Sequence, residues 1–164
     1  MKLNIEQIRQ ITRGVVRIEE EQDGVHFYRF TKAQEELYRS VSNDFFKKSH
    51  ATAGVRMEFL TNSETLEIKT KVSSGSSRTY FAFDVFVNGE LKGYLANFNE
   101  DDVTEDYISA EYEWGDFSKT FLLGEGKKTV TIYFPWSAVA VMEALIVDDD
   151  AFVEPTKEKK KLLV

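Results

Sequence analysis

The sequence contains no cysteine, and only two prolines and two histidines among its 164 residues. Without cysteine the chain forms no disulfide, no thiolate metal site and no cysteine nucleophile. The absence of cysteine is typical of proteins in a reducing compartment. The first six residues contain no apolar signal core, and no apolar run reaches the length of a membrane span. We therefore expect a cytoplasmic protein that does not enter a membrane.

Positive charge is also scarce. Lys and Arg number 21 against 28 Asp and Glu, so the net charge is −7. Nucleic-acid binding needs a basic surface, because the phosphate backbone supplies most of the affinity. The only basic cluster is the short run from Lys157 to Lys161, which we interpret as a solvated linker. We therefore expect no nucleic-acid partner.

Alternation of apolar and polar residues is the main structural signal. It is clearest at residues 66–72, where Leu66, Ile68, Thr70 and Val72 share one face. About ten such segments follow one another at short spacing, which predicts an all-β fold. The expected architecture is an antiparallel two-sheet β-sandwich, jelly-roll-like, with one or two short helices near the N-terminus.

Local signals place several elements. Residues 4–12 have helical spacing with Asn4 as N-cap, and a second short helix starts after Thr31, although Glu35 is one residue too far for a capping box. Asp23-Gly24 and Asn88-Gly89 predict hairpin turns.

Further along the chain, residues 108–114 and 117–123 predict a hairpin around Gly115-Asp116. Residues 97–106 are acidic and predict a loop, and residues 139–147 favour a strand over a helix.

Catalytic and metal-binding patterns are missing. His26 lies within a strand pattern and His50 precedes one, and neither a Gly-x-Ser-x-Gly elbow nor an HExxH motif occurs. The acidic runs 100–102 and 148–150 offer oxygens to calcium but lack the spacing of a dedicated loop, which favours solvated turns. A pair of carboxylates for glycoside chemistry stays open, because nothing selects one. We predict no catalytic residue, no metal site and no cofactor.

Three polar-aromatic segments remain that a scaffold alone does not need: residues 51–56, 75–80 and 134–138. Arg78 follows a Ser/Gly loop and could pair with Asp84 or bind a carboxylate. Trp136 follows a strand end, where a large aromatic residue is either a core plug or an exposed platform. Five residues in or beside these segments are candidates for contact with a substrate or with another domain: Trp136, Arg78, Arg56, Ser137 and His50.

These segments, together with residues 83–89 and 133–137, resemble the N-terminal β-sandwich domain of SGNH (GDSL-type) hydrolases. The tail Lys161-Leu162-Leu163-Val164 is similar to the strand that leads into the Gly-Asp-Ser nucleophile block of those enzymes. The resemblance covers about residues 10–164.

The resemblance implies a two-domain protein. Residues 1–154 would form the β-sandwich, and residues 155–164 the linker and the first residues of an α/β SGNH hydrolase domain. The full-length protein would be a serine esterase, lipase or acylhydrolase, whereas this chain alone would not be an enzyme. Its expected partners are the C-terminal hydrolase domain of the same chain and an ester or glycan ligand.

Two other functions stay open. The chain could be a freestanding carbohydrate-binding module with an aromatic platform, which requires Trp114, Trp136 and tyrosines on one exposed face. It could also be a self-association domain whose edge strands pair between copies. The sequence does not indicate an oligomeric state.

Overall fold

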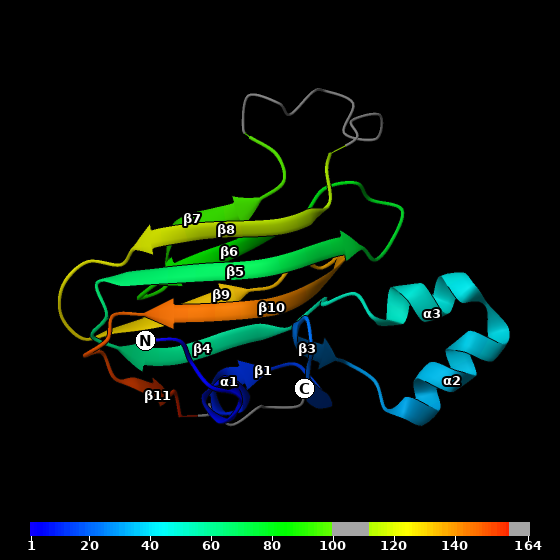
Figure 1. The fold of residues 1–164 in the computed structure, drawn as a ribbon, viewed down its shortest axis with the longest axis horizontal. Coiled ribbons are helices and arrows are strands. Elements are labelled where there is room, and N and C mark those ends of the chain that lie inside the picture. The colour runs from blue at the N-terminus through cyan, green and yellow to red at the C-terminus, as the bar shows by residue number, and fades with distance from the viewer. Residues whose placement is uncertain (100–111, 158–164) are drawn as a thin grey trace, which may run out of the picture.

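The computed structural model describes residues 1–99 and 112–157. These residues form two antiparallel sheets and three short helices (Figure 1). Sheet A has the strand order β2 (Arg17–Glu21), β3 (Gly24–Tyr28), β10 (Ala138–Val147), β5 (Thr65–Ser74) and β8 (Gly115–Leu122). Sheet B has the order β1 (Thr12–Arg13), β4 (Arg56–Thr61), β9 (Lys128–Tyr133), β6 (Ala82–Val87) and β7 (Glu90–Ala96), and β11 (Val153–Pro155) pairs with β4. The expected mostly-β chain is confirmed.

The strands pair in a nested order along the chain. In sheet A, β3 pairs with β10, and β5 pairs with β8. In sheet B, β4 pairs with β9, and β6 pairs with β7. Each of these pairs encloses the next one in the sequence, so most sheet contacts join residues far apart in the chain.

The two sheets share one hydrophobic core. The predicted inward positions of β5 are at most 1% exposed, and the Thr70 hydroxyl donates to the Val141 carbonyl at 2.8 Å, which satisfies the buried polar group. Phe134 contacts Phe27 of sheet A at 4.9 Å and Phe83 of sheet B at 5.0 Å between ring centroids. Aromatic side chains therefore connect the sheets through the core.

The helices begin at capping residues. Asn4 and Gln7 form a capping box at the start of α1 (Ile5–Ile11), as its position predicts. Thr31 also forms a box at the start of α2 (Lys32–Val41), but with Gln34, the residue at the required spacing, instead of Glu35.

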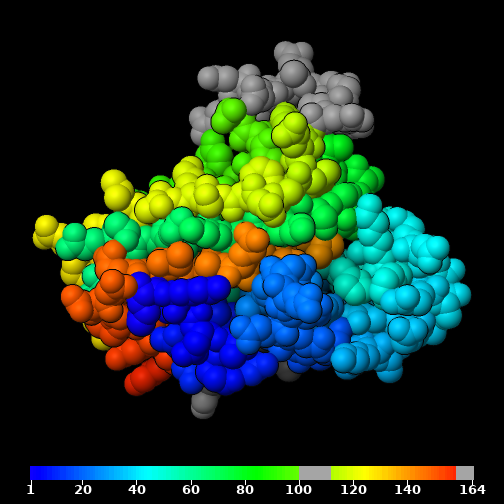
Figure 2. All heavy atoms as spheres, viewed as in Figure 1, coloured from blue at the N-terminus to red at the C-terminus, as the bar shows by residue number. Residues whose placement is uncertain are grey.

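The helix α3 (Asn43–Ser49), which starts after Ser42, was not expected. Together α2 and α3 form a lobe at one side of the molecule (Figure 2). No helix among the described residues has the length and apolarity that a membrane crossing requires.

One predicted hairpin is wrong and two predicted turns are confirmed. Gly115 and Asp116 are not a turn, because they open β8 and pair with Val72 and Lys71 of β5. Glu21 pairs with Gly24 across the first predicted turn, and Asn88 has the positive φ of 53° that a tight Asn-Gly hairpin requires. Two segments, 100–111 and 158–164, lie outside the described residues. Parts of the predictions for the acidic loop at residues 97–106, for the strand at residues 108–114 and for the linker fall on them.

Asp148 ties the end of β10 to the connection between β4 and β5. Its carboxylate accepts hydrogen bonds from the backbone N–H of Glu64 at 2.6 Å, from that of Thr65 at 3.3 Å and from the Thr65 hydroxyl. The Thr65 hydroxyl, followed by the Glu64 N–H, lowers the pKa of Asp148 to about 2. The neighbouring Asp149 pairs with the terminal ammonium of Met1 at 2.6 Å.

We expect the Asp148→Asn variant to lose part of the acid sensitivity of the fold. A carboxyl group whose folded pKa is lowered contributes stability above its ordinary pKa of 3.8, and this stability is lost as the pH falls towards 2. Urea unfolding at several pH values between 6 and 2.5 measures the effect, with Asp150→Asn as the matched control. Equal pH slopes for the wild type and Asp148→Asn between pH 4 and pH 2.5 would contradict the prediction.

Candidate functional site

The three polar-aromatic segments meet at one end of the sheets, and Thr52 joins two of them. Its buried hydroxyl donates to the Pro135 carbonyl at 2.9 Å, and its backbone N–H donates to the Ala138 carbonyl at 2.9 Å. The Phe134 N–H donates to the Val55 carbonyl at 3.0 Å. Segment 51–56 is thus hydrogen-bonded along segment 134–138.

The third segment packs against both. A Cβ atom added at Gly75 would lie 3.0 Å from the Ala51 Cβ and 3.0 Å from the Ala138 carbonyl carbon, so only glycine fits without a shift. The guanidinium carbon of Arg78 lies 4.2 Å from the ring centroid of Trp136. Segments that are far apart in the sequence therefore build one loop surface.

Arg78 and Trp136 are the exposed part of this surface. Trp136 is 57% exposed, so it is a platform and not a core plug. The Arg78 guanidinium stacks on the Trp136 ring and donates to the Tyr80 hydroxyl. Among the described residues Arg78 makes no ion pair with Asp84, whose pKa is raised by burial. The stack is a combined aromatic and cationic contact surface.

Further aromatic rings that the sequence analysis did not select extend this surface. The Tyr80 ring lies 6.1 Å from Phe98, which stacks on Tyr94 at 6.2 Å between centroids. Asn97 fixes the loop, since its side chain accepts from the Phe81 N–H at 2.9 Å and donates to the Thr79 carbonyl at 3.0 Å.

The other three candidate residues do not share the exposed stack. Ser137 is buried, with 4% exposure. Arg56 begins β4 and pairs with Glu58 at 3.3 Å. His50 ends α3, where its Nδ1 donates to the Phe46 carbonyl at 2.9 Å. No described contact joins His50 to Arg78 or Trp136.

His50 lies instead beside a charged cavity of about 210 Å³ between the α2–α3 lobe and the β2–β3 hairpin. Its ring packs against Tyr28 at 5.7 Å, and Arg17 also lies over the Tyr28 ring at 4.0 Å. Arg17 pairs with the buried Glu35 at 2.6 Å, which fastens α2 to β2. No sequence signal marked this ion pair, because nothing in the chain order shows that α2 folds back onto β2.

The outer face of the α2–α3 lobe exposes apolar side chains. Leu37, Val41 and Phe45 are 60%, 63% and 52% exposed. Phe45 also lines an apolar groove of about 280 Å³ with Phe30 and Tyr38. Exposed apolar side chains gathered on two neighbouring helices are typical of an interaction surface.

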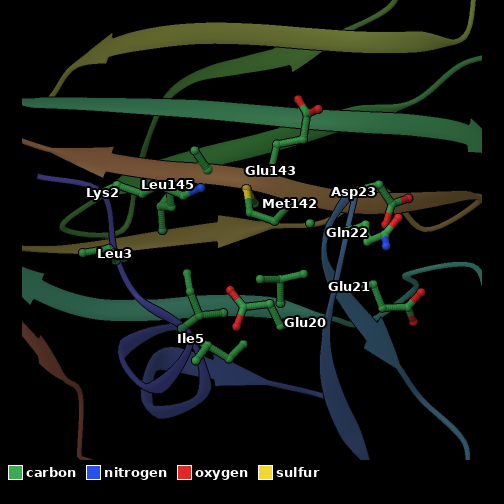
Figure 3. A pocket seen from close by; sticks show the side chains of 14 residues that line it. Lys2, Leu3, Ile5, Glu20, Glu21, Gln22, Asp23, Met142, Glu143 and Leu145 are labelled. Carbon is green, nitrogen blue, oxygen red and sulfur yellow. The ribbon is translucent and has the colours of Figure 1, made fainter.

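A cavity of about 400 Å³ lies between α1, the turn of the β2–β3 hairpin and β10 (Figure 3). Apolar residues such as Leu3, Ile5 and Met142 line one part, and the acidic residues Glu20 and Glu21 line the hairpin side.

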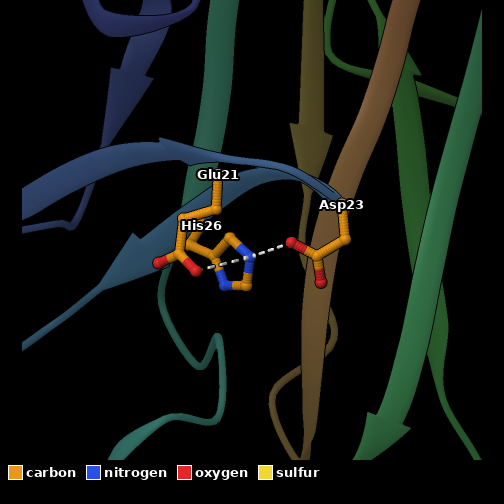
Figure 4. A group of neighbouring side chains, drawn as sticks. All are labelled: Glu21, Asp23 and His26. Atoms are coloured by element: carbon orange, nitrogen blue, oxygen red, sulfur yellow. Dashed lines mark hydrogen bonds and ion pairs between the residues drawn. The ribbon is translucent and has the colours of Figure 1, made fainter.

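Three side chains of the same hairpin converge beside this cavity. The donor atoms of Glu21, Asp23 and His26 lie within 4.8 Å of one another (Figure 4). The sequence pattern predicts that His26 is a polar residue on a strand face, and it predicts no metal site. The local signal was the Asp-Gly turn, with Glu21 two residues before Asp23 and His26 three residues after it.

Comparison with known proteins shows a shared fold. No protein-family model and no curated protein sequence matches the chain. A solved structure of a salicylyl-acyltransferase from a tetracycline biosynthetic pathway is similar over 91% of this chain, with a TM-score of 0.69 and 18% identity. A protein from Bacteroides ovatus named as a GDSL-like lipase is similar over 92%, with a TM-score of 0.58 and 16% identity. The likeness concerns the fold alone.

The chain is much shorter than these two proteins. It covers 40% of the acyltransferase and 42% of the GDSL-like lipase. More than half of each similar chain therefore has no counterpart in the compared residues.

Proposed function

We propose that this chain is the non-catalytic N-terminal accessory domain of an SGNH/GDSL-type esterase, lipase or acylhydrolase. The observation that carries the proposal is the fold match over more than nine-tenths of this chain to two proteins named for acyl chemistry, of which it covers only about 40%. A hydrolase domain following residues 155–164 would supply the nucleophile. The absence of cysteine supports a cytoplasmic location.

The nested strand pairing supports a jelly-roll sandwich for this domain. In a jelly roll, outer strand pairs enclose inner pairs across two facing sheets. The order β3·β10, β4·β9, β5·β8 and β6·β7 follows this scheme, and the two sheets share one core. In such folds the loops at the sheet ends are available for function, as at the Arg78–Trp136 stack.

The α2–α3 lobe is the docking surface in this proposal. Leu37, Val41 and Phe45 would be covered by the hydrolase domain of the same chain, which removes their apolar surface from water. The Arg78–Trp136 stack would then border the substrate cleft and contact an ester or glycan group. Arginine and tryptophan are enriched among the residues that dominate binding energy.

Expression of this chain alone and of the reading frame extended past Val164 tests the proposal. The isolated chain should not hydrolyse p-nitrophenyl acetate, and the extended protein should. In the extended protein, Val41→Asp should uncouple the unfolding of the two domains, whereas Val16→Asp, at a residue 57% exposed elsewhere, should not. Hydrolysis by the isolated chain, or an extension without a Gly-Asp-Ser block, would refute the proposal.

A carbohydrate-binding module is the second candidate, because Trp136 is exposed and carries a stacked guanidinium. Trp114 does not belong to such a platform, since it stacks on Phe81 of the core at 6.1 Å. Titration with cello- and xylo-oligosaccharides should quench the fluorescence of the wild type but not of Trp136→Ala. An unchanged fluorescence in both proteins would exclude this candidate.

A further inference from the structure

The His26 imidazole stands between two carboxylates at the tip of the β2–β3 hairpin. Its Nε2 lies 2.8 Å from the Asp23 Oδ1 and 3.9 Å from the Glu21 Oε2 (Figure 4). One ring nitrogen carries at most one hydrogen, so it cannot bond both carboxylates. Three electron-pair donors thus converge on one point, where two negative groups favour a cation.

The hairpin holds these donors firmly. Glu21 ends β2 and pairs with Gly24, the first residue of β3, so Asp23 lies in the tight turn between them. The Tyr28 hydroxyl donates to the Glu21 Oε1 at 3.1 Å, which leaves Oε2 directed towards His26. Outer hydrogen bonds of this kind orient metal ligands.

We propose that Glu21, Asp23 and His26 bind a divalent transition-metal ion of the Zn²⁺ class. The ligand atoms of a tetrahedral zinc site, bound at about 2.0–2.1 Å, lie about 3.3 Å apart. The separations of 2.8 Å and 3.9 Å from the His26 Nε2 lie on either side of that value, and all three ligand atoms lie within 4.8 Å of one another, so side-chain adjustments complete the site.

The donor set selects the metal. Calcium and magnesium prefer shells made only of oxygen, whereas imidazole suits zinc and its neighbours. Three protein ligands leave a fourth position for water or a ligand. Glu21 and Asp23 also belong to the residues around the 400 Å³ cavity.

Isothermal titration of the 164-residue chain with ZnCl2 at pH 7 tests the site. We expect saturable binding of one Zn²⁺ per chain. His26→Gln and Glu21→Gln should each weaken it at least about tenfold, since even changes to residues that only hydrogen-bond a metal ligand cost about 10–100-fold in affinity. Glu20→Gln is the matched control: Glu20 is adjacent, lines the same cavity and loses the same charge, but lies outside the group. Its affinity should stay within about twofold.

Several outcomes would overturn the proposal. These are an absence of saturable binding, an undiminished affinity in His26→Gln, and an equal loss in Glu20→Gln and Glu21→Gln, which would indicate general attraction to acidic groups. CaCl2 binding as tight as ZnCl2 binding would also overturn it.

Discussion

Replacement of Arg17 by methionine should lower the free energy of unfolding by about 3–5 kcal/mol, because a buried carboxylate then loses its cation. The Arg17 and Glu35 side chains are only 17% and 9% exposed, and their N–O distance is 2.6 Å. Only Oε2 of Glu35 is satisfied, since its buried Oε1 has no hydrogen-bond partner among the described residues. Arg17 also donates to the Phe30 carbonyl at 3.1 Å and to Glu19. Loss of Arg17 therefore removes two contacts with β2: that of Phe30, just before α2, and that of Glu35, within α2.

Urea unfolding measures this effect, and two further variants separate the possible causes. Arg39→Met removes a guanidinium that is 54% exposed and should cost less than about 1 kcal/mol. The double variant Arg17→Met/Glu35→Leu removes the charge together with its partner and should recover most of the stability. If Arg17→Met costs no more than Arg39→Met, the pair does not hold α2 on the hairpin.

Local rules predicted the elements that depend on neighbouring residues. Alternation placed Leu66, Ile68 and Val72 in the core, and the chemistry of the Asn88-Gly89 turn placed a hairpin. The same rules failed at Gly115, because glycine also occurs in strands, and pairing with β5 decides its conformation. The helix α3 is not predicted by the alternation pattern, although Ser42 and Asp44 are an N-terminal signal.

The candidate site was predicted only in its parts. Residue type and loop context predict Arg78 and Trp136 as contact residues. Their surroundings are joined by Thr52, which forms hydrogen bonds with Pro135 and Ala138, 83 and 86 positions later in the chain. No local pattern encodes such contacts. Glu21, Asp23 and His26 are the opposite case, since they are close in the sequence. No metal site is predicted there from the sequence, because the two histidines lie far apart and no HExxH motif occurs.

The Gly14→Ala variant should be much less stable than Gly54→Ala, although the two glycines have nearly the same backbone conformation. Their φ angles are +81° and +78°, so alanine costs about 1–2 kcal/mol at either position. A Cβ on Gly54 would meet nothing within 4 Å in the part of the chain that the structure describes, whereas a Cβ on Gly14 would lie 2.2 Å from the Gly54 carbonyl oxygen. Overpacking of this kind adds about 1–3 kcal/mol.

This pair of variants also connects stability with the candidate site. Gly54 precedes Val55, whose carbonyl accepts the Phe134 N–H two residues before Trp136. A shift of the Gly54 carbonyl should therefore disturb the loop that carries the Arg78–Trp136 stack. Urea unfolding should give a difference of about 1–3 kcal/mol between the variants, and only Gly14→Ala should change the native fluorescence of Trp136. Equal stability of the two variants would mean that the close approach of Gly14 to Gly54 is relieved without a cost in free energy. The chain around Gly14 and Gly54 would then move independently of the loop that carries the Arg78–Trp136 stack.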